Sequence, residues 1–421
     1  MMMPRKPHLH FHSDCDFFAG CENMLANFFA DARLQENFEI SFSYRYTPAY
    51  QDGLRQRVPS LPSMFALPLI SEASSGQWAR KWPPPLSYIF RLMYALIGLR
   101  YWIMLLNVWK LCFAWKGRKI DLLHINNGGY PGASSARAAI IAARILGIQH
   151  VVMVVNNIAV PPRIHERPFE YLISCLFRRW VSAFITGSHF ASKALQERIG
   201  GKKALFLGLH NGIGSRQPSE TTQHTRNRLG IHASELVFGI VALLESRKGH
   251  RVLFHAVAEM NRHLPNEIRP LILVEGHGPE EADLRDLVTR LGLDKQIRFI
   301  GQEQNIFNFI QCIDLLLVPS IDYEDFPNVV LEAMSLGKPV IASSLAGIPE
   351  QVNDKVSGWL VAPGDIGQLS RAMLNIVHHR ALIHEAGKSA SVRFNQFFRA
   401  DIAVSRYLNL YHLLLEMKEK K

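Results

Sequence analysis

Short apolar segments rich in Val, Ile and Phe alternate along most of the chain with segments whose apolar residues recur at helical spacing. Buried strands of a parallel sheet form nearly continuous apolar runs, and helical crossovers join them. The pattern therefore predicts an α/β fold. In the first half the predicted strands are His8 to His12, Glu39 to Tyr44, Asp121 to Ile125, His150 to Asn156, Ala183 to Thr186 and Ala204 to Leu209.

A polar stretch divides the chain. Residues Gly212 to Arg228 (GIGSRQPSETTQHTRNR) have almost no apolar side chains, which is typical of a linker that runs into a helix. A second alternating set follows, with predicted strands Leu236 to Leu244, Arg269 to Glu275, Ile297 to Ile300, Leu315 to Pro319 and Pro339 to Ala342. We expect an N-terminal domain over residues 1–215, a second domain over 216–395, and a C-terminal helix over 396–421 that packs back towards the first domain.

Length and charge narrow the function classes. A chain of 421 residues, 48% apolar, suffices for two domains of about 200 residues each. The 47 Lys and Arg against 36 Asp and Glu give a net charge of +11, which favours anionic partners such as nucleotide diphosphates or acidic lipids. The basic residues are dispersed and no nucleic-acid-binding module accompanies them, so nucleic acid is the least favoured partner.

The five cysteines are scattered and form no C-x-x-C pair, which indicates neither a disulfide framework nor a zinc ribbon and favours a reducing cytoplasm. The N-terminus lacks an apolar signal region, so we expect the protein to stay in the cytoplasm.

Residues Leu86 to Lys116 form the most apolar stretch, but Arg91, Arg100 and Lys110 interrupt it before about 18 uncharged residues accumulate. A spanning helix is therefore not expected. Two alternatives remain: helices packed within the N-terminal domain, or an element on an anionic membrane surface, since Trp, Tyr and basic residues together suit such an interface. The second would attach the protein peripherally to the inner face of the cell membrane.

The segment Val318 to Val352 predicts strand, loop, helix and strand in turn. Pro327 suits the first turn of a helix over Asn328 to Leu336. First-turn amides, including those of Asn328 and Val329, lack intrahelical acceptors and lie at the positive end of the helix dipole. The segment therefore predicts a site for a diphosphate.

Two carboxylates flank this predicted anion site. Glu324 precedes the helix and Glu332 lies one turn inside it, so one can accept hydrogen bonds from ribose hydroxyls and the other from sugar hydroxyls. The alternative is that both are ordinary solvated charges.

The two glutamates form an E-x7-E pattern with DFPNVVL between them, followed by AMSLGKPVIAS and a Gly-x-Pro-Glu turn at Gly347 to Glu350. This block closely resembles the retaining GT-B glycosyltransferases of family 4. The resemblance implies two Rossmann-like doubly wound domains that face a central cleft, with a nucleotide-sugar donor bound by the C-terminal domain. It implies a catalytic role for Glu324 and donor contacts from Phe326, Asn328, Val329 and Glu332.

Further matches follow in the expected order. VALLESRKGH, Val241 to His250, resembles the family's strand followed by Lys-Gly, which implies that Lys248 contacts the donor diphosphate as a compact charge. The family usually carries an arginine where this chain has Leu243, and Arg247 is the candidate substitute. LVEGHGPEEADL, starting at Leu273, and IRFIGQ, starting at Ile297, also match, the latter where related enzymes cradle the base.

The first half resembles the family more loosely. DCDFFAGCENML places Gly20 in a turn that would let backbone approach the donor phosphates; a simple tight turn is the alternative. Many relatives carry His-x-His where this chain has His124-Ile-Asn126, so His124 is the candidate catalytic residue facing the sugar. The alternative is a buried histidine with satisfied hydrogen bonds. Asn156 stands where relatives often carry another histidine.

Two metal-binding patterns lie near the N-terminus. Asp14-Cys15-Asp16 has a D-x-D form, and His8, His10 and His12 would share one face of a strand. Both lack companion motifs, and the resemblance implies a metal-independent enzyme without a cofactor.

The sequence thus predicts transfer of a sugar from a nucleoside diphosphate donor to a hydroxyl acceptor with retention, the acceptor being a saccharide or a lipid-linked saccharide. Polysaccharide, lipopolysaccharide or glycolipid synthesis is the expected setting. The alternatives are a sugar-nucleotide epimerase or hydrolase on the same fold, and a non-catalytic binding protein, which Leu243 and Asn126 favour. The base, the sugar and the linkage are open.

Overall fold

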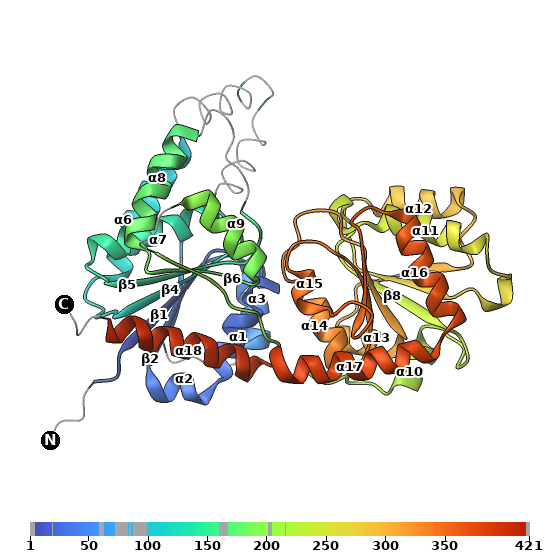
Figure 1. Cartoon of the computed structure of the whole chain (residues 1–421). Helices are drawn as coiled ribbons and strands as arrows, with labels where there is room; N and C mark the ends of the chain where they lie inside the picture. Colours follow the sequence, from blue (N-terminus) through green and yellow to red (C-terminus); the bar gives the residue numbers. More distant parts are fainter. Residues whose placement is uncertain are drawn as a thin grey trace. The chain divides into compact units, whose positions relative to one another are not determined.

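The computed structural model describes residues 5–18, 20–58, 63–71, 83, 86, 99–159, 167–200, 204–214 and 216–417. The chain divides into two compact units (Figure 1): an N-terminal unit of residues 1–209 with 404–421, and a C-terminal unit of residues 210–403. Each described unit contains one parallel sheet, and together the sheets confirm the predicted α/β architecture of two doubly wound domains.

The sheet of the N-terminal unit has the strand order β3-β2-β1-β4-β5-β6-β7. Its strands are β1 (His8–Ser13), β2 (Glu39–Arg45), β3 (Met64–Leu67), β4 (Leu122–Asn127), β5 (His150–Val155), β6 (Ala183–Thr186) and β7 (Leu205–Gly208). The chain starts in the middle, winds to one edge and then to the other. This reversal of direction is typical of doubly wound folds, which bind ligands at the carboxyl ends of the strands.

Helices cover both faces of this sheet. One face carries α6 (Leu99–Trp115), α7 (Ser134–Ile145), α8 (Arg167–Trp180) and α9 (His189–Ile199). The other helices in the described part of this unit are η1 (Gly20–Glu22), α1 (Asn23–Ala30), α2 (Ala32–Asn37), α3 (Pro48–Arg57) and α18 (Ala400–Glu416). Alternate side chains of β1 point to opposite faces of the sheet: Phe11 packs on Phe28 of α1, and His10 packs on Trp115 of α6. The strand is buried throughout because both of its faces are covered.

The sheet of the C-terminal unit has the order β10-β9-β8-β11-β12-β13. Its strands are β8 (Val237–Val241), β9 (Leu271–Glu275), β10 (Ile297–Gly301), β11 (Leu315–Val318), β12 (Val340–Ser343) and β13 (Gly358–Val361). Its helices are α10 (Thr222–Arg228), η3 (Ser246–Lys248), α11 (His250–Asn261), η4 (Asn266–Ile268), α12 (Glu281–Arg290), α13 (Ile306–Cys312), α14 (Asn328–Ser335), α15 (Ile348–Gln351), α16 (Ile366–His378) and α17 (Ala381–Phe397).

Two hydrophobic clusters hold these helices to opposite faces of the sheet. Helices α11, α12 and α16 pack against Phe238, Ile240, Val274 and their neighbours. Helices α13, α14 and α17 pack against Val237, Leu273, Leu316 and Val318. Helix α14, which carries the E-x7-E motif, is therefore fixed by its apolar face, and its N-terminus lies at the carboxyl edge of the sheet.

Most predicted strands occur at the predicted positions, and the structure adds two short edge strands. The apolar pattern does not predict β3 (MFAL) or β13 (GWLV), because four residues are too few to show the period that separates a strand from a loop. The predicted C-terminal helix is interrupted: α17 ends at Phe397 and α18 begins at Ala400. From Val404 onward, α18 belongs to the N-terminal unit.

The apolar segment Leu86 to Lys116 is described at Leu86 and from Leu99 onward; Arg91 lies outside the described residues. Its described part is α6, a helix of the N-terminal unit. Among the residues that the structure describes, no helix is long and apolar enough to cross a membrane.

Gly249 fixes the loop that follows β8 against the loop that follows β11. It has a φ of 76°, and a Cβ atom there would lie 1.9 Å from the carbonyl oxygen of Pro319. Next to it, the Ile321 amide donates a hydrogen bond of 2.8 Å to the Arg247 carbonyl. This main-chain contact requires glycine and brings together two loops at the carboxyl edge of the sheet.

We predict that Gly249→Ala lowers the free energy of unfolding by roughly 3 kcal/mol or more, because left-handed strain of about 1 kcal/mol adds to the overlap with Pro319. Gly292→Ala is the matched control, since Gly292 has a φ of 68° but no neighbouring atom within 4 Å of the place that a Cβ atom would take. Its expected cost is about 1 kcal/mol. Urea denaturation measures both, and equal losses would contradict the role of the Pro319 contact.

Candidate functional site

The carboxyl edge of the C-terminal sheet brings together residues of two loops that lie far apart in the sequence. Lys248 Nζ donates a hydrogen bond to a carboxylate oxygen of Glu324, which Arg247 approaches to 3.9 Å. The Ser320 hydroxyl lies 3.4 Å from the same oxygen. Only 8% of Glu324 is exposed, so its charge is held by these partners rather than by water.

Arg247 is held in place by groups of its own loop and of the facing loop. Its Nε donates to Glu245 at 2.8 Å, and its Nη1 lies 3.4 Å from the Tyr323 carbonyl. Leu243, which stands where the related enzymes usually carry arginine, is 38% exposed. The sequence therefore supplies a cation to this edge from position 247 rather than 243, and the contact of Arg247 with a donor stays a prediction.

Helix α14 begins beside this ion pair. Pro327 is its N-cap and places Asn328 and Val329 in the first turn, and no side chain caps the helix at Pro327. Gln351 fixes the entry by donating 3.0 Å to the Pro327 carbonyl. The positive end of the helix dipole and the two cations thus lie at one edge, which is a suitable arrangement for a diphosphate.

Glu275, which the sequence analysis did not single out, ends β9 at the same edge. It is 6% exposed and accepts a hydrogen bond of 3.0 Å from the Glu303 amide. Burial, with the nearby charges of Glu303 and Glu332, raises the pKa of Glu275 from 4.5 to about 7. The sequence signal for Glu275 was an acidic residue at the end of the apolar strand LILVE, in the segment starting at Leu273 that resembles the family.

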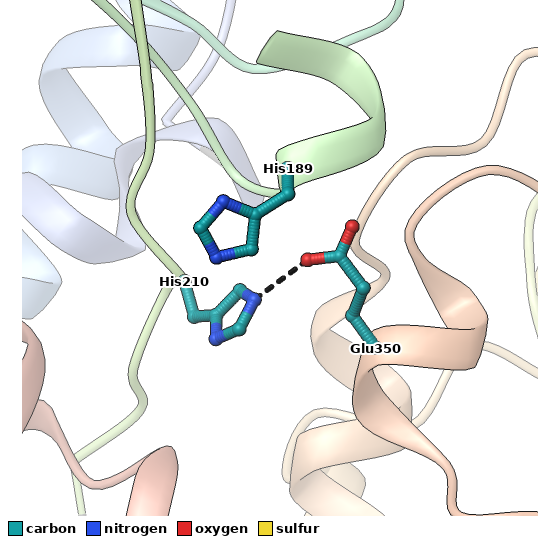
Figure 2. A group of neighbouring side chains, drawn as sticks. All are labelled: His189, His210 and Glu350. Atoms are coloured by element: carbon teal, nitrogen blue, oxygen red, sulfur yellow. Dashed lines mark hydrogen bonds and ion pairs between the residues drawn. The ribbon is translucent and has the colours of Figure 1, made fainter. Parts of the chain in front are cut away.

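Phe326 is a packing residue of the same loop. It is 6% exposed; its ring stacks on the His210 ring with centroids 5.1 Å apart and meets Phe398 edge to face. Figure 2 shows the hydrogen bond of 2.7 Å from the His210 ring to Glu350 of α15. The third residue drawn there, His189, belongs to the N-terminal unit. The side chain of Phe326 thus anchors the start of α14, and its contact with a donor stays a prediction.

His124 occupies the core of the N-terminal unit, contrary to the sugar-facing role that the sequence suggested. It is 1% exposed, and its Nδ1 lies 2.6 Å from the Tyr411 hydroxyl of α18. Phe11 and Phe28 pack against its ring, and burial lowers its pKa to about 3. The structure therefore favours the alternative of a satisfied buried histidine. In a parallel strand such as β4, neighbouring residues face opposite sides, so His124 points to the α1 and α18 layer.

A buried polar network lies at the carboxyl ends of β1, β4 and β5. Glu22 accepts hydrogen bonds from the Ser13 hydroxyl at 3.0 Å and from Asn126 at 3.2 Å, and Asn156 donates to Asn126 at 2.9 Å. Gly20 opens the short helix η1 that carries Glu22 to this position. The two asparagines that replace histidines of the related enzymes therefore contact each other, which separate sequence matches do not reveal.

The N-terminal histidines and aspartates have protein partners. His8, His10 and His12 point to one side of β1 and share hydrogen bonds with Ser41 and Ser43 of β2, at 2.6 to 3.0 Å. Burial lowers the pKa of all three, that of His12 to about 4.

Asp14 and Asp16 both pair with the Arg45 guanidinium. In the described structure these carboxylates and imidazoles serve to hold β1 and β2 together.

The sequence of the C-terminal unit is similar to those of known proteins. Residues 235–379 match the family described as "Glycosyl transferases group 1". The chain is 28% identical over 190 residues to N-acetyl-alpha-D-glucosaminyl L-malate synthase of Bacillus anthracis, a match covering 45% of this chain and 49% of that protein. It is 26% identical over 342 residues to 2-deoxystreptamine glucosyltransferase of Streptomyces kanamyceticus, covering 77% and 85%. The match to the B. anthracis protein thus spans about half of its length.

A solved structure resembles the whole fold. The crystal structure of Anabaena HepE in complex with UDP superposes with a TM-score of 0.74 at 21% identity, covering 96% of this chain and 99% of that one. The two parallel sheets therefore constitute the GT-B fold.

We predict that Glu275→Gln stabilises the protein above pH 7. Its raised pKa means that the folded protein binds a proton more tightly than the unfolded chain, so native stability falls as pH rises from 4.5 to about 7. A neutral amide keeps an acceptor for the Glu303 amide and removes this penalty, on the order of 3 kcal/mol at pH 8.

Denaturation of wild type and variant between pH 4 and pH 8 measures the difference. The two curves should converge below pH 4.5, where Glu275 is protonated in both the folded and the unfolded chain. A constant gap across this range would contradict the titration of Glu275. Glu267→Gln, which neutralises an exposed carboxylate, is the control.

Proposed function

We propose that the protein transfers a sugar from a nucleoside diphosphate sugar to a hydroxyl acceptor, with retention at the anomeric carbon. The match of residues 235–379 to the family described as "Glycosyl transferases group 1" supports this proposal. The observation that carries the proposal is the meeting of Lys248, Arg247, Glu324 and the start of α14 at one sheet edge. HepE, which shares the fold, is described in complex with UDP, so uridine is the first base to test.

The proposed reaction uses the charges at this edge. As the glycosidic bond breaks, negative charge develops on the departing diphosphate, and Lys248, Arg247 and the first-turn amides of α14 stabilise it. The phosphate oxygens of the donor replace the Glu324 carboxylate as the hydrogen-bond partner of Lys248. Glu324 then accepts from hydroxyls of the transferred sugar, and Glu332 accepts from the ribose hydroxyls. The departing phosphate takes the acceptor proton, and the mechanism requires no metal or other cofactor, because protein cations neutralise the diphosphate.

Two alternatives share this donor site. An epimerase or hydrolase would release nucleotide from the donor without any acceptor, and a non-catalytic binding protein would hold the nucleotide without turnover. Timed nucleotide release with and without added saccharide acceptors separates the three. Acceptor-dependent release supports the transferase, acceptor-independent release supports the hydrolase or epimerase, and tight binding without release supports the binding protein.

The acceptor is proposed to be a saccharide or lipid-linked saccharide of a polysaccharide or glycolipid pathway, at the cytoplasmic face of the cell membrane. Helix α6 supports this setting. On one face of α6, residues such as Met104 and Leu111 are buried. The opposite face exposes Trp102 (59%), Trp109 (69%) and Phe113 (76%), with the exposed Leu105 and Leu106 between them. Exposed apolar stripes of this size mark interaction surfaces.

The basic residues Lys116 and Arg118, exposed directly after α6, add attraction to anionic lipid. We define the exposed stripe on α6 as Trp102, Leu105, Leu106, Trp109 and Phe113. An anionic bilayer is its proposed partner.

We predict that one nucleoside diphosphate among UDP, GDP, ADP and dTDP raises the thermal unfolding midpoint by a few degrees. A ligand at 100 times its Kd stabilises the native state by about 2.7 kcal/mol. Lys248→Ala and Glu332→Ala should each abolish the shift, measured against the variant's own midpoint. Lys295→Ala, at an exposed position of the same unit, should keep it. A shift that survives both site variants would place the nucleotide elsewhere.

We predict that the double variant Trp109→Ser, Phe113→Ser binds vesicles of phosphatidylglycerol at least tenfold more weakly than wild type in sedimentation. Each side chain contributes roughly 1.5 to 3 kcal/mol when it leaves water. Leu413→Ser, at an exposed position of α18, is the control. Because these side chains are exposed, the unfolding midpoint should not fall. Unchanged vesicle binding of the double variant would contradict the assignment of the α6 stripe.

A further inference from the structure

A cavity of about 700 Å³ opens at the amino-terminal edge of the C-terminal sheet. The residues that precede β8, β11 and β12 form one wall, among them Ser234, Asp314 and Lys338. One side of α17 forms the other wall, with Lys388 and Ser391. A cavity of this size accommodates a small organic ligand.

The cavity is separate from the donor edge. Asp314 precedes β11 and Ser320 follows it, and six steps of about 3.3 Å along a strand place the two edges roughly 20 Å apart. Helix α14 begins at the donor edge with Asn328 and ends at Ser335, after which Gly337 and Lys338 line the cavity. One helix therefore connects the two places without either being part of the other.

Two of the charged groups in the cavity wall already have partners. Arg226 pairs with Asp314 at 3.1 Å. It also donates hydrogen bonds to the carbonyls of Cys312, His232, Ala233 and Glu235. Asp314 also accepts from the Val237 amide at 2.8 Å. The Arg226–Asp314 pair holds α10 against the sheet, and the two charges neutralise each other.

Three further cations of the wall have no such partner. In the described part of the chain, Lys338, Arg380 and Lys388 form no salt bridge and no side-chain hydrogen bond, while Glu235 is the only other carboxylate of the wall. Burial lowers the pKa of Lys338, which Asp314 offsets only in part. The nearby carboxylate of Asp314 is already paired with Arg226, so the partly buried ammonium of Lys338 is a cost to the protein that a bound anion would reduce.

The wall between these cations is closely packed. A Cβ atom on Gly387 of α17 would lie 2.2 Å from the carbonyl oxygen of Gly337. Glycine inside a helix costs about 1 kcal/mol relative to alanine, so a reason for it is expected, and this contact supplies one. The close approach of α17 to the turn before β12 fixes Lys388 and Lys338 on facing walls.

We propose that this cavity binds a small phosphate ester. The phosphate group would lie between the ammonium groups and the Arg380 guanidinium, which provide several donors for its oxygens. The hydroxyls of Ser234 and Ser391 and the amide of Asn395 would contact a polar organic part, for which the cavity has room beyond the phosphate. The site is independent of the proposed donor site and would exist in a non-catalytic protein as well.

Isothermal titration of the full chain tests the proposal with three probes: glucose 6-phosphate, inorganic phosphate and glucose. We expect glucose 6-phosphate to bind, inorganic phosphate to bind more weakly, and glucose not to bind. Equal affinity for the two phosphates would show that the organic part makes no contact, which overturns the ester proposal. Absence of binding by both at millimolar concentrations overturns it entirely.

Variants locate the site. Lys388→Gln and Lys338→Met should each weaken glucose 6-phosphate binding about tenfold or more, because each removes a charge-assisted hydrogen bond. The first changes an exposed residue, and the second replaces a partly buried ammonium by an apolar chain of similar length, so both should fold. Lys295→Gln is the matched control. Binding that survives both cavity variants but is lost in Lys248→Ala would place the ligand at the donor edge and overturn the proposal.

Discussion

The largely buried ion pair between Lys248 and Glu324 is the interaction on which the donor edge depends. It joins the loop after β8 to the loop after β11, where Gly249 lets the two backbones meet. A buried charge without a partner destabilises a protein by several kcal/mol, so each member of the pair requires the other as long as no ligand is bound. A diphosphate can replace the carboxylate as the partner of Lys248. The resting site is thus charge-balanced and can exchange one anion for another.

The parallel sheet determines why these groups meet. All strands of a unit end on the same edge, so loops from distant parts of the sequence converge there. Helix α14 adds its positive end because its apolar side is held by the sheet and α17. The opposite edge collects the loops before the strands, and there the unpaired cations of the cavity wall gather. One sheet thereby provides two places of different chemistry without a further structural element.

The N-terminal unit illustrates how burial decides the chemistry of polar residues. His124 is surrounded by aromatic rings, so its pKa lies far below the neutral range and its ring acts as a packing element. Glu22 also lies in the interior, but it is surrounded by donors and organises Ser13 and Asn126 at the carboxyl end of β1 and β4. The polar groups Glu22, Asn126 and Asn156 therefore lie together at the carboxyl ends of the strands, whereas His124 lies among aromatic rings.

The sequence by itself determined the fold class, most strands, the start of α14 and, as two separate segments, the Lys-Gly and E-x7-E motifs. These features are local: an apolar run of four or more residues, a proline at a helix start and a short motif each carry their own signal. The tertiary structure alone decided which polar residues are buried and what surrounds them. It buried His124 among aromatic rings, brought Glu275 near Glu332, and placed Lys338 and Lys388 in the wall of one cavity. Burial and electrostatic neighbours depend on contacts between distant segments, and no spacing along the chain encodes them.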